Sequence, residues 1–269
     1  MPLLNDLFKA TDWVNPDDVP RSVVTYGYTS DKAGPIALDF HRHRKGQVML
    51  VQRGALTCEV ESGLWIVPPR SAVWIPGGML HAVKMTGALE CFDAFVDPAV
   101  SQGLPQVCCA VSVTPLLREL ITRAAQLPLL YDETDVNARL VRVLLDELAA
   151  AQLEVLHLPM PADARLRKMV DTMIAAPSDR GTLDVWAGRA GLSQRTLERM
   201  IVKETGMSFG RWRQQLAVML AVKWLAGGAS IQQAAADLGY ESMPSFVTMF
   251  RKVLGTSPGR YMAERYSRN

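Results

Sequence analysis

The sequence predicts an α+β multidomain protein with an N-terminal β-barrel, connecting helices, and a C-terminal all-α domain that carries two helix-turn-helix units. Three observations predict this class. Short β-rich segments fill residues 21–97, and helical spacing of apolar residues begins near residue 114. In addition, the stretch that starts at Ser193 returns in similar form at Ser242, 49 residues further along the chain.

Charge divides the chain in the same way. Residues 1–160 hold 13 Lys and Arg against 18 Asp and Glu, a net of −5, whereas residues 161–269 hold 16 against 9, a net of +7. A basic region joined to an acidic one suggests that only the basic region meets a polyanion. We therefore predict a β-rich barrel over residues 1–100, connecting or dimerisation helices over 101–160, and a domain over 161–269 that binds a polyanion such as DNA; the family resemblances given below imply that the barrel senses an effector.

The barrel is predicted from segments rich in β-branched and aromatic residues, which clusters of Gly, Pro and Ser separate. Many short strands at this spacing are typical of a barrel or sandwich. The segments are RSVVTYGY, PIALDFHRH, QVMLVQRGALTCEVE, LWIVPP, AVWIPG, HAVKM and LECFDAFV.

Three of the four histidines lie in this region in a suggestive frame. His41 and His43 are two apart, so on a strand both side chains point to one face. With Gln47 and His81 they could surround one divalent metal ion, since imidazole suits Zn, Fe, Ni or Cu. The alternative is that the three histidines bind a polar ligand or water without any metal. No other cofactor is expected.

The same residues carry a family resemblance. His41-x-His43 is followed by Gln47 and Gly54, and PGGMLH supplies Pro76, Gly78 and His81; together they resemble the two cupin motifs. The resemblance covers roughly residues 34–97 and implies a small cupin-like β-barrel. Two departures are Gln47, where the family has Glu, and Met85, where a later Asn is usual. The change to Gln removes a negative charge and weakens the metal site without abolishing it.

Helices are predicted over residues 114–156. Thr114-Pro115 is a good helix start, and Thr134 is a plausible cap for the next helix. Leu140, Leu144 and Leu148 then recur every four residues and form an apolar stripe too broad for a solvated helix. The stripe packs either on its own barrel or on a second subunit, and a stripe alone does not name its partner.

The repeated stretch is interpreted as a pair of helix-turn-helix units. In the first copy a short helix ends near Gly191, and Ser193 can cap a second helix whose Leu197 and Ile201 share a buried face. In the second copy Gly239 makes the turn and Ser242 is the cap. A long apolar helix, ending at Gly227-Gly228, joins the two copies.

Residues 163–266 resemble the DNA-binding domain of the AraC/XylS transcription regulators. The pattern S-x-x-x-L-x-R-x-x-x-K-x-x-G falls at Ser193, Leu197, Arg199, Lys203 and Gly206; A-x-x-x-G-[FY] falls at Ala235, Gly239 and Tyr240; and G-T-S-P-x-x-Y spans 255–261. The resemblance implies that the two second helices enter successive major grooves on one face of the DNA. One departure is Ala217-Val218, which replaces a usual Arg-Leu pair and weakens a structural contact.

The two DNA-reading helices are predicted to do different work. Hydrogen-bonded base readout is expected from the first, because Arg and Gln can contact guanine and adenine with two hydrogen bonds each. The second offers few hydrogen-bonding side chains at its exposed end, so apolar contact and phosphate anchoring are expected from it. The predicted DNA-binding residues are Gln194, Arg195, Thr196 and Arg199 in the first helix, and Met243, Pro244, Ser245, Thr248, Arg251 and Lys252 in the second.

The predicted function is a ligand-responsive, sequence-specific transcription regulator. The partners expected are double-stranded DNA and a small-molecule effector, with RNA polymerase and a second copy of the chain as further candidates. The histidine run resembles a cupin-type subgroup found beside exporter genes, which suggests control of an exporter or detoxification gene. No catalytic residue set stands out, so no enzymatic activity is expected; the alternative is a metal-dependent cupin enzyme with a helical tethering or dimerisation domain.

Cytoplasmic localisation is the further expectation. The N-terminus lacks the basic start and apolar run of a signal peptide, and no run of about 18 uncharged apolar residues predicts a membrane span. The four cysteines form no C-x-x-C pair and are expected to be buried, reduced thiols.

Overall fold

The computed structural model describes residues 14–30, 36–154 and 157–266. The chain forms two compact units. The first contains Met1–Val60 and Trp65–His157, and the second contains Glu61–Leu64 and Leu158–Asn269. Residues 101–157, predicted to be a separate connecting segment, therefore belong to the same unit as the sheet.

The first unit is built on an antiparallel sheet in the order β1-β6-β3-β5-β7-β8, with β2 paired to β6 and β4 paired to β3. Short 3₁₀ turns, η2 (Pro16–Asp18) and η3 (Pro98–Val100), flank it. The strands are β1 (Val23–Ser30), β2 (Ile36–His41), β3 (Gly46–Val60), β4 (Gly63–Val67), β5 (Ser71–Ile75), β6 (His81–Val96), β7 (Cys109–Ser112) and β8 (Leu153–Glu154).

This sheet corrects one part of the predicted fold. Within the described residues the pairing runs from β1 at one edge to β8 at the other and does not join its ends. The α+β class is confirmed, but the sheet is not a closed barrel. Short strands predict a curved antiparallel sheet, whereas closure depends on pairing between strands far apart in the sequence.

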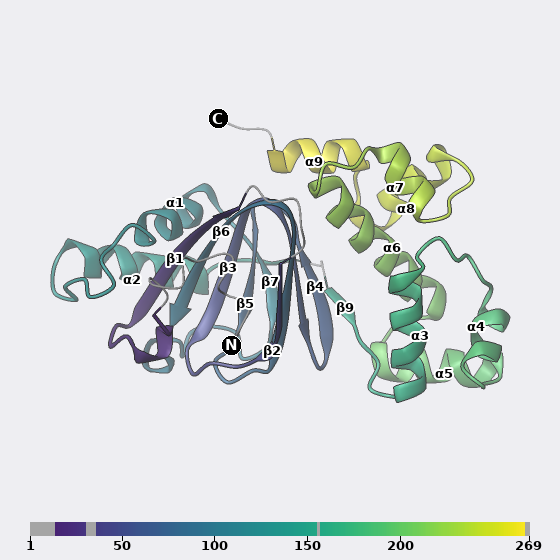
Figure 1. Cartoon of the computed structure of the whole chain (residues 1–269), viewed down its shortest axis with the longest axis horizontal. Helices are drawn as coiled ribbons and strands as arrows, with labels where there is room; N and C mark the ends of the chain where they lie inside the picture. The colour runs from purple at the N-terminus through teal and green to yellow at the C-terminus, as the bar shows by residue number, and fades with distance from the viewer. Residues whose placement is uncertain (1–13, 31–35, 155–156, 267–269) are drawn as a thin grey trace. The chain divides into compact units, whose positions relative to one another are not determined.

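Both faces of the sheet are buried. Alternate side chains of β3 belong to two different apolar clusters, one on each face. Val48 and Leu50 point to the face covered by helices α1 (Pro115–Ala124) and α2 (Val136–Ala149), as Figure 1 shows. Met49 and Val51 point to the opposite face, where a second apolar cluster forms. Successive side chains of a strand face opposite ways, so one strand supplies both cores.

The apolar stripe of α2 packs on its own unit. Leu144 and Leu148 are buried against the sheet, and Leu140 is partly buried there. Thr114 caps α1 as predicted, by accepting a hydrogen bond from the Leu117 amide. The cap of α2 is Asp135, and not the predicted Thr134, because the Asp135 carboxylate accepts from the Asn137 amide.

The second unit is helical after a short strand, β9 (His157–Pro159). Its long helix α6 has a buried middle, and helices α5, α7 and α8 all contact it (Figure 1). Among the described residues, no helix combines the length and hydropathy that crossing a bilayer demands. The helices are α3 (Ala164–Ala175), α4 (Leu183–Arg189), α5 (Gln194–Thr205), α6 (Phe209–Ala226), α7 (Ile231–Asp237), α8 (Met243–Leu254) and α9 (Pro258–Tyr266).

Candidate nucleic-acid interface and histidine cluster

The helices α4–α5 and α7–α8 form the two predicted helix-turn-helix units. Ser193 and Ser242 cap α5 and α8 by accepting hydrogen bonds from the backbone amides three residues on, at 3.2 and 3.4 Å. Gly206 and Gly255 end the same helices in the left-handed conformation. The 49-residue repeat is therefore a repeat of helix starts and ends, and it sets which faces of α5 and α8 point outward.

The exposed face of α5 carries the predicted polar side chains. Gln194, Arg195 and Arg199 are exposed, and no hydrogen bond or ion pair within the described chain engages them. Thr196 is half-buried, and its hydroxyl lies 2.9 Å from the Ser193 hydroxyl. Three of the four predicted α5 residues are thus open to a partner, whereas Thr196 is partly committed to the cap.

The exposed end of α8 has a different chemistry. Met243 is 50% exposed at the first turn, beside Pro244. The Ser245 hydroxyl lies 2.9 Å from the Ser242 hydroxyl, so it takes part in the cap. Thr248 is exposed, as are Arg251 and Lys252 in the last turn.

Helix α6 joins the two helix-turn-helix units and sets their separation. Its 18 residues span about 27 Å at the usual rise of an α-helix, which is comparable to the roughly 34 Å turn of B-DNA. Trp212 and Val218 are fully buried along it. Residues 217–218, where the usual Arg-Leu pair is missing, therefore still anchor the helix through Val218, while Ala217 is half-buried.

In the first compact unit of the chain, which contains the sheet, the structure brings the three predicted histidines together. The ring nitrogens available as ligands in His41, His43 and His81 lie within 4.8 Å of one another. His41 ends β2 and pairs with His81 at the start of β6. His43 lies past the end of β2, so strand alternation does not place it as expected; the loop before β3 turns it toward the pair instead.

The second nitrogen of each ring defines the tautomer. The Nδ1 atoms of His41, His43 and His81 lie 2.8, 2.5 and 2.9 Å from backbone carbonyl oxygens. A carbonyl only accepts, so each Nδ1 donates its proton, and a neutral ring then presents a lone pair at Nε2. Burial lowers the pKa of His81 to about 4 and also lowers that of His43, so both rings are neutral at pH 7. The Nε2 of His81 is buried without a hydrogen-bond partner.

Gln47 joins the cluster through two contacts. Its Oε1 lies 3.0 Å from Nε2 of His43, and its Nε2 donates to the Asp93 carboxylate at 2.9 Å. Gln47 and Asp93 are 5% and 3% exposed. Burial raises the pKa of Asp93 to about 7.

The sequence interpretation missed Asp93. A signal was present, because Asp93 is the one acid among the apolar residues of the strand segment CFDAFV. A lone carboxylate on a buried strand needs a partner, and here the partners include Gln47 and the Cys91 thiol, which donates to it at 3.7 Å.

The fold and the exposed faces of α5 and α8 define a helix-turn-helix DNA-binding protein. Residues 186–264 match the family described as a helix-turn-helix domain. The chain is 44% identical over 223 residues to the HTH-type transcriptional regulator NimR of Escherichia coli, covering 83% of this chain and 81% of that protein. It is 33% identical over 103 residues to the regulator RipA of Corynebacterium glutamicum, covering 38% of this chain and 31% of that one.

A solved structure of ToxT from Vibrio cholerae covers 92% of this chain and 99% of its own, with 10% identity and a TM-score of 0.40. The likeness to NimR, which extends over most of both chains, shows the family. The chain belongs to the AraC family of helix-turn-helix transcription regulators, and it is a DNA-binding transcription regulator. These relatives are named as regulators, and none of them supports the enzyme alternative.

Proposed function

We propose that this regulator senses a small-molecule effector through its first unit, at a site where His41, His43 and His81 hold one divalent metal ion. The observation that carries the proposal is the convergence of three imidazole rings, of which the neutral His81 has its Nε2 buried without a hydrogen-bond partner. Ligating histidines usually donate their other N–H to a carbonyl or carboxylate, and all three rings have that arrangement.

Gln47 is the fourth ligand in this proposal. The Oε1 of Gln47 lies 3.0 Å from Nε2 of His43, so the two atoms are close enough to bind the same cation. Asp93 orients the amide by accepting from its nitrogen. A bound divalent ion would supply an open coordination position for a donor atom of the effector.

Metal content of the purified, untagged protein tests the proposal. We expect one equivalent of a divalent ion such as Zn, Fe, Ni or Cu per chain, and its loss in His43→Gln and His81→Gln. His157→Gln is the matched control, because His157 stacks on Trp65 outside the cluster. A metal present at 100 times its Kd should stabilise the protein by about 2.7 kcal/mol, seen as a rise in Tm. Equal metal content in all three variants would sink the proposal.

Gln47→Glu separates a metal site from a metal-free polar network. A carboxylate beside Asp93 adds repulsion that a cation offsets, so without metal this variant should melt lower than the wild type. With metal it should gain more in Tm than the wild type gains. If added metal leaves the loss in Tm unchanged, the histidines bind a polar ligand or water instead.

On DNA, we propose that α5 supplies most hydrogen-bonded base readout and that α8 supplies apolar contact and phosphate anchoring. The uncommitted side chains of Gln194, Arg195 and Arg199 support this division. Candidate sites lie in the DNA upstream of the regulator's own gene and of any adjacent exporter gene. Equal affinity for this DNA and for random duplex would overturn sequence-specific recognition.

A second copy of the chain and RNA polymerase are the other proposed partners. Leu116, Val136 and Val143 on α1 and α2 are 51%, 61% and 43% exposed, which supports a homodimer through these helices. Sedimentation of the purified chain tests the dimer, and in vitro transcription from the bound promoter tests the polymerase contact.

A further inference from the structure

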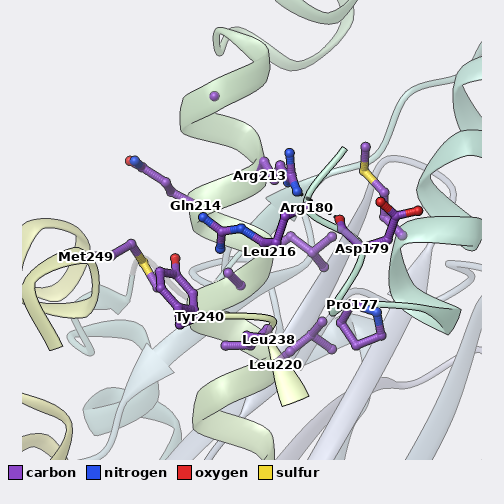
Figure 2. A pocket seen from close by; sticks show the side chains of 13 residues that line it. Pro177, Asp179, Arg180, Arg213, Gln214, Leu216, Leu220, Leu238, Tyr240 and Met249 are labelled. Atoms are coloured by element: carbon purple, nitrogen blue, oxygen red, sulfur yellow. Dashed lines mark hydrogen bonds between the residues drawn. The ribbon is translucent and has the colours of Figure 1, made fainter. Parts of the chain in front are cut away.

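A cavity of about 310 Å³ lies in the helical second unit of the chain, and Figure 2 shows the side chains that line it. Four segments line it: Met173 at the end of α3, the loop of residues 177–180 before the first helix-turn-helix unit, residues 210–220 of α6, and residues 238–249 of the second helix-turn-helix unit. None of the side chains predicted to contact bases or phosphates lines this cavity. The cavity therefore belongs to neither the DNA-reading surface nor the histidine cluster.

One side of the cavity is cationic. Arg213 of α6 donates to the carbonyl oxygens of Gly181 and Asp179, at 2.6 and 2.8 Å. The guanidinium of Arg180 lies over the ring of Tyr240, 4.2 Å from its centroid, and Figure 2 shows the two side chains together. Within the described chain, no hydrogen bond or ion pair engages the Arg180 guanidinium.

The nearby carboxylate of Asp179 acts on the charge of Arg213, but its hydrogen bonds go to other groups. The Asp179 carboxylate accepts from Arg189 at 2.5 Å and from the Gly181 amide at 2.9 Å, so it is already engaged by another cation. Burial and the neighbouring Arg180 charge both lower the pKa of Arg213. Two close guanidinium groups beside an open volume favour an anion as the occupant.

The other side of the cavity is apolar. Leu216, Leu220, Leu238 and Met249 are between 2% and 7% exposed and contribute side chains to it. In Figure 2, Leu220 and Leu238 lie on the opposite side from Arg213. Ala217 also lines the cavity, so the small residue at this position leaves volume that a larger side chain would fill. A ligand matched to both sides has one anionic group and an apolar body.

An occupant of this cavity would touch the second helix-turn-helix unit, the helix α6 that joins the two units, and the loop that precedes the first. The loop before α4 and the turn before α8 are packed closely, because a Cβ added at Gly239 would lie 2.3 Å from the Ser178 carbonyl oxygen. Met249 belongs to α8 itself, and Arg213 belongs to the helix that joins the two units. A change in this packing would therefore reach α8 directly, and α5 through its contacts with α6.

We propose that this cavity is a second effector site, which binds a small carboxylate with an apolar body between Arg180, Arg213 and the leucine side, and thereby changes DNA affinity. The carboxylate pairs with the two guanidinium groups, and the apolar body replaces water against Leu220 and Leu238. The change in DNA affinity rests on the regulator function, whereas binding itself does not. By linkage, the ligand and DNA must alter each other's affinity by the same factor.

Isothermal titration of the full chain with 2-naphthoate tests binding, with neutral 2-naphthalenemethanol as the ligand control. We expect saturable binding of one naphthoate at this site, at least tenfold tighter than the alcohol. Arg180→Gln and Ala217→Leu should each weaken naphthoate at least tenfold, the first by removing charge and the second by filling volume. Arg211→Gln is the matched control, because Arg211 is an exposed arginine of the same helix that does not line the cavity.

A DNA arm distinguishes a small carboxylate from a DNA phosphate as the natural anion. We expect naphthoate to bind the protein–DNA complex as well as the free protein. Its affinities for these two species should differ by the same factor by which naphthoate changes the affinity of the protein for DNA. Complete displacement of naphthoate by saturating duplex would assign the arginines to a phosphate and overturn the proposal. So would absence of naphthoate binding, or equal binding by the wild type and both cavity variants. If Arg195→Ala changes DNA recognition but still binds naphthoate, the result bears on the proposed base readout and leaves the cavity proposal untouched.

Discussion

The two helix-turn-helix units share their internal construction and differ on their surfaces. Leu197 and Ile201 of α5 are fully buried, as are Phe246 and Phe250 at the equivalent positions of α8. The exposed residues that correspond are unlike: Gln194, Arg195 and Arg199 in α5 stand where α8 has Met243, Pro244 and Thr248. Caps and core set the orientation of a helix, and they are retained in both copies; the surfaces, which read the partner, are free to diverge.

The turns differ as well. Gly191 is followed after two residues by the cap Ser193, whereas Gly239 is followed after three by Ser242. An added Cβ at Gly191 would meet open space, but one at Gly239 would lie against the loop ahead of the first unit. The turn of the second helix-turn-helix unit is therefore held by a contact that the turn of the first one lacks. This contact joins the second helix-turn-helix unit to the loop that precedes the first.

Substitution of the turn glycines should give the largest effect. Both have positive φ, +67° at Gly191 and +70° at Gly239. Gly191→Ala should cost about 1–2 kcal/mol through backbone strain alone. Gly239→Ala adds a clash with the Ser178 carbonyl and should cost about 3 kcal/mol or more. Urea unfolding of the full chain measures the difference, and equal costs would show that the loop yields freely.

The second-largest effect is expected on DNA affinity and specificity, when side chains that read bases are removed. Arg195→Ala should weaken binding to the specific site by about 1–3 kcal/mol and relax specificity at one base pair. Thr248→Ala on the other reading helix is the comparison, with an expected loss below about 1 kcal/mol. Binding to a panel of single-base operator variants measures both. If the two variants lose the same specificity, the two helices read bases alike and the division of labour is wrong.

The helix caps should contribute equally in the two units. Ser193→Ala and Ser242→Ala each remove a side-chain acceptor for a first-turn amide and should cost about 1 kcal/mol of stability. Ser193→Gly and Ser242→Gly should cost only a few tenths, because glycine is an acceptable cap. Thermal unfolding gives the four values. If one of the two alanine substitutions leaves stability unchanged, the caps of the two helix-turn-helix units do not contribute equally to the free energy of unfolding.

Phosphate anchoring should give the smallest effect. Arg251→Ala should weaken all DNA sequences alike and reduce the slope of log K against log salt by about 1. Salt titrations with specific and random duplex provide the test. A loss confined to the specific duplex would place Arg251 on a base instead.

Local chemistry in the sequence was sufficient for the DNA-binding half. Helix starts at Ser193 and Ser242, the turn glycines, and the apolar spacing of each reading helix depend on residues at most four apart, so they are visible in the chain itself. The exposed faces followed from the buried ones, because one side of a helix determines the other. The cap of α2 was misplaced by one residue, since Thr134 and Asp135 are both good caps and only backbone geometry distinguishes them.

The sequence predicted that His41, His43 and His81 meet, but only the tertiary structure showed how they are paired and which other distant residues meet. His41 and His81 are paired through the register of β2 and β6, Gln47 reaches Asp93 across β3 and β6, and Arg180 lies over Tyr240. The open sheet and the cavity beside α6 have the same origin. Each depends on packing between segments that are not neighbours along the chain, and helical or strand spacing of residues does not encode such packing.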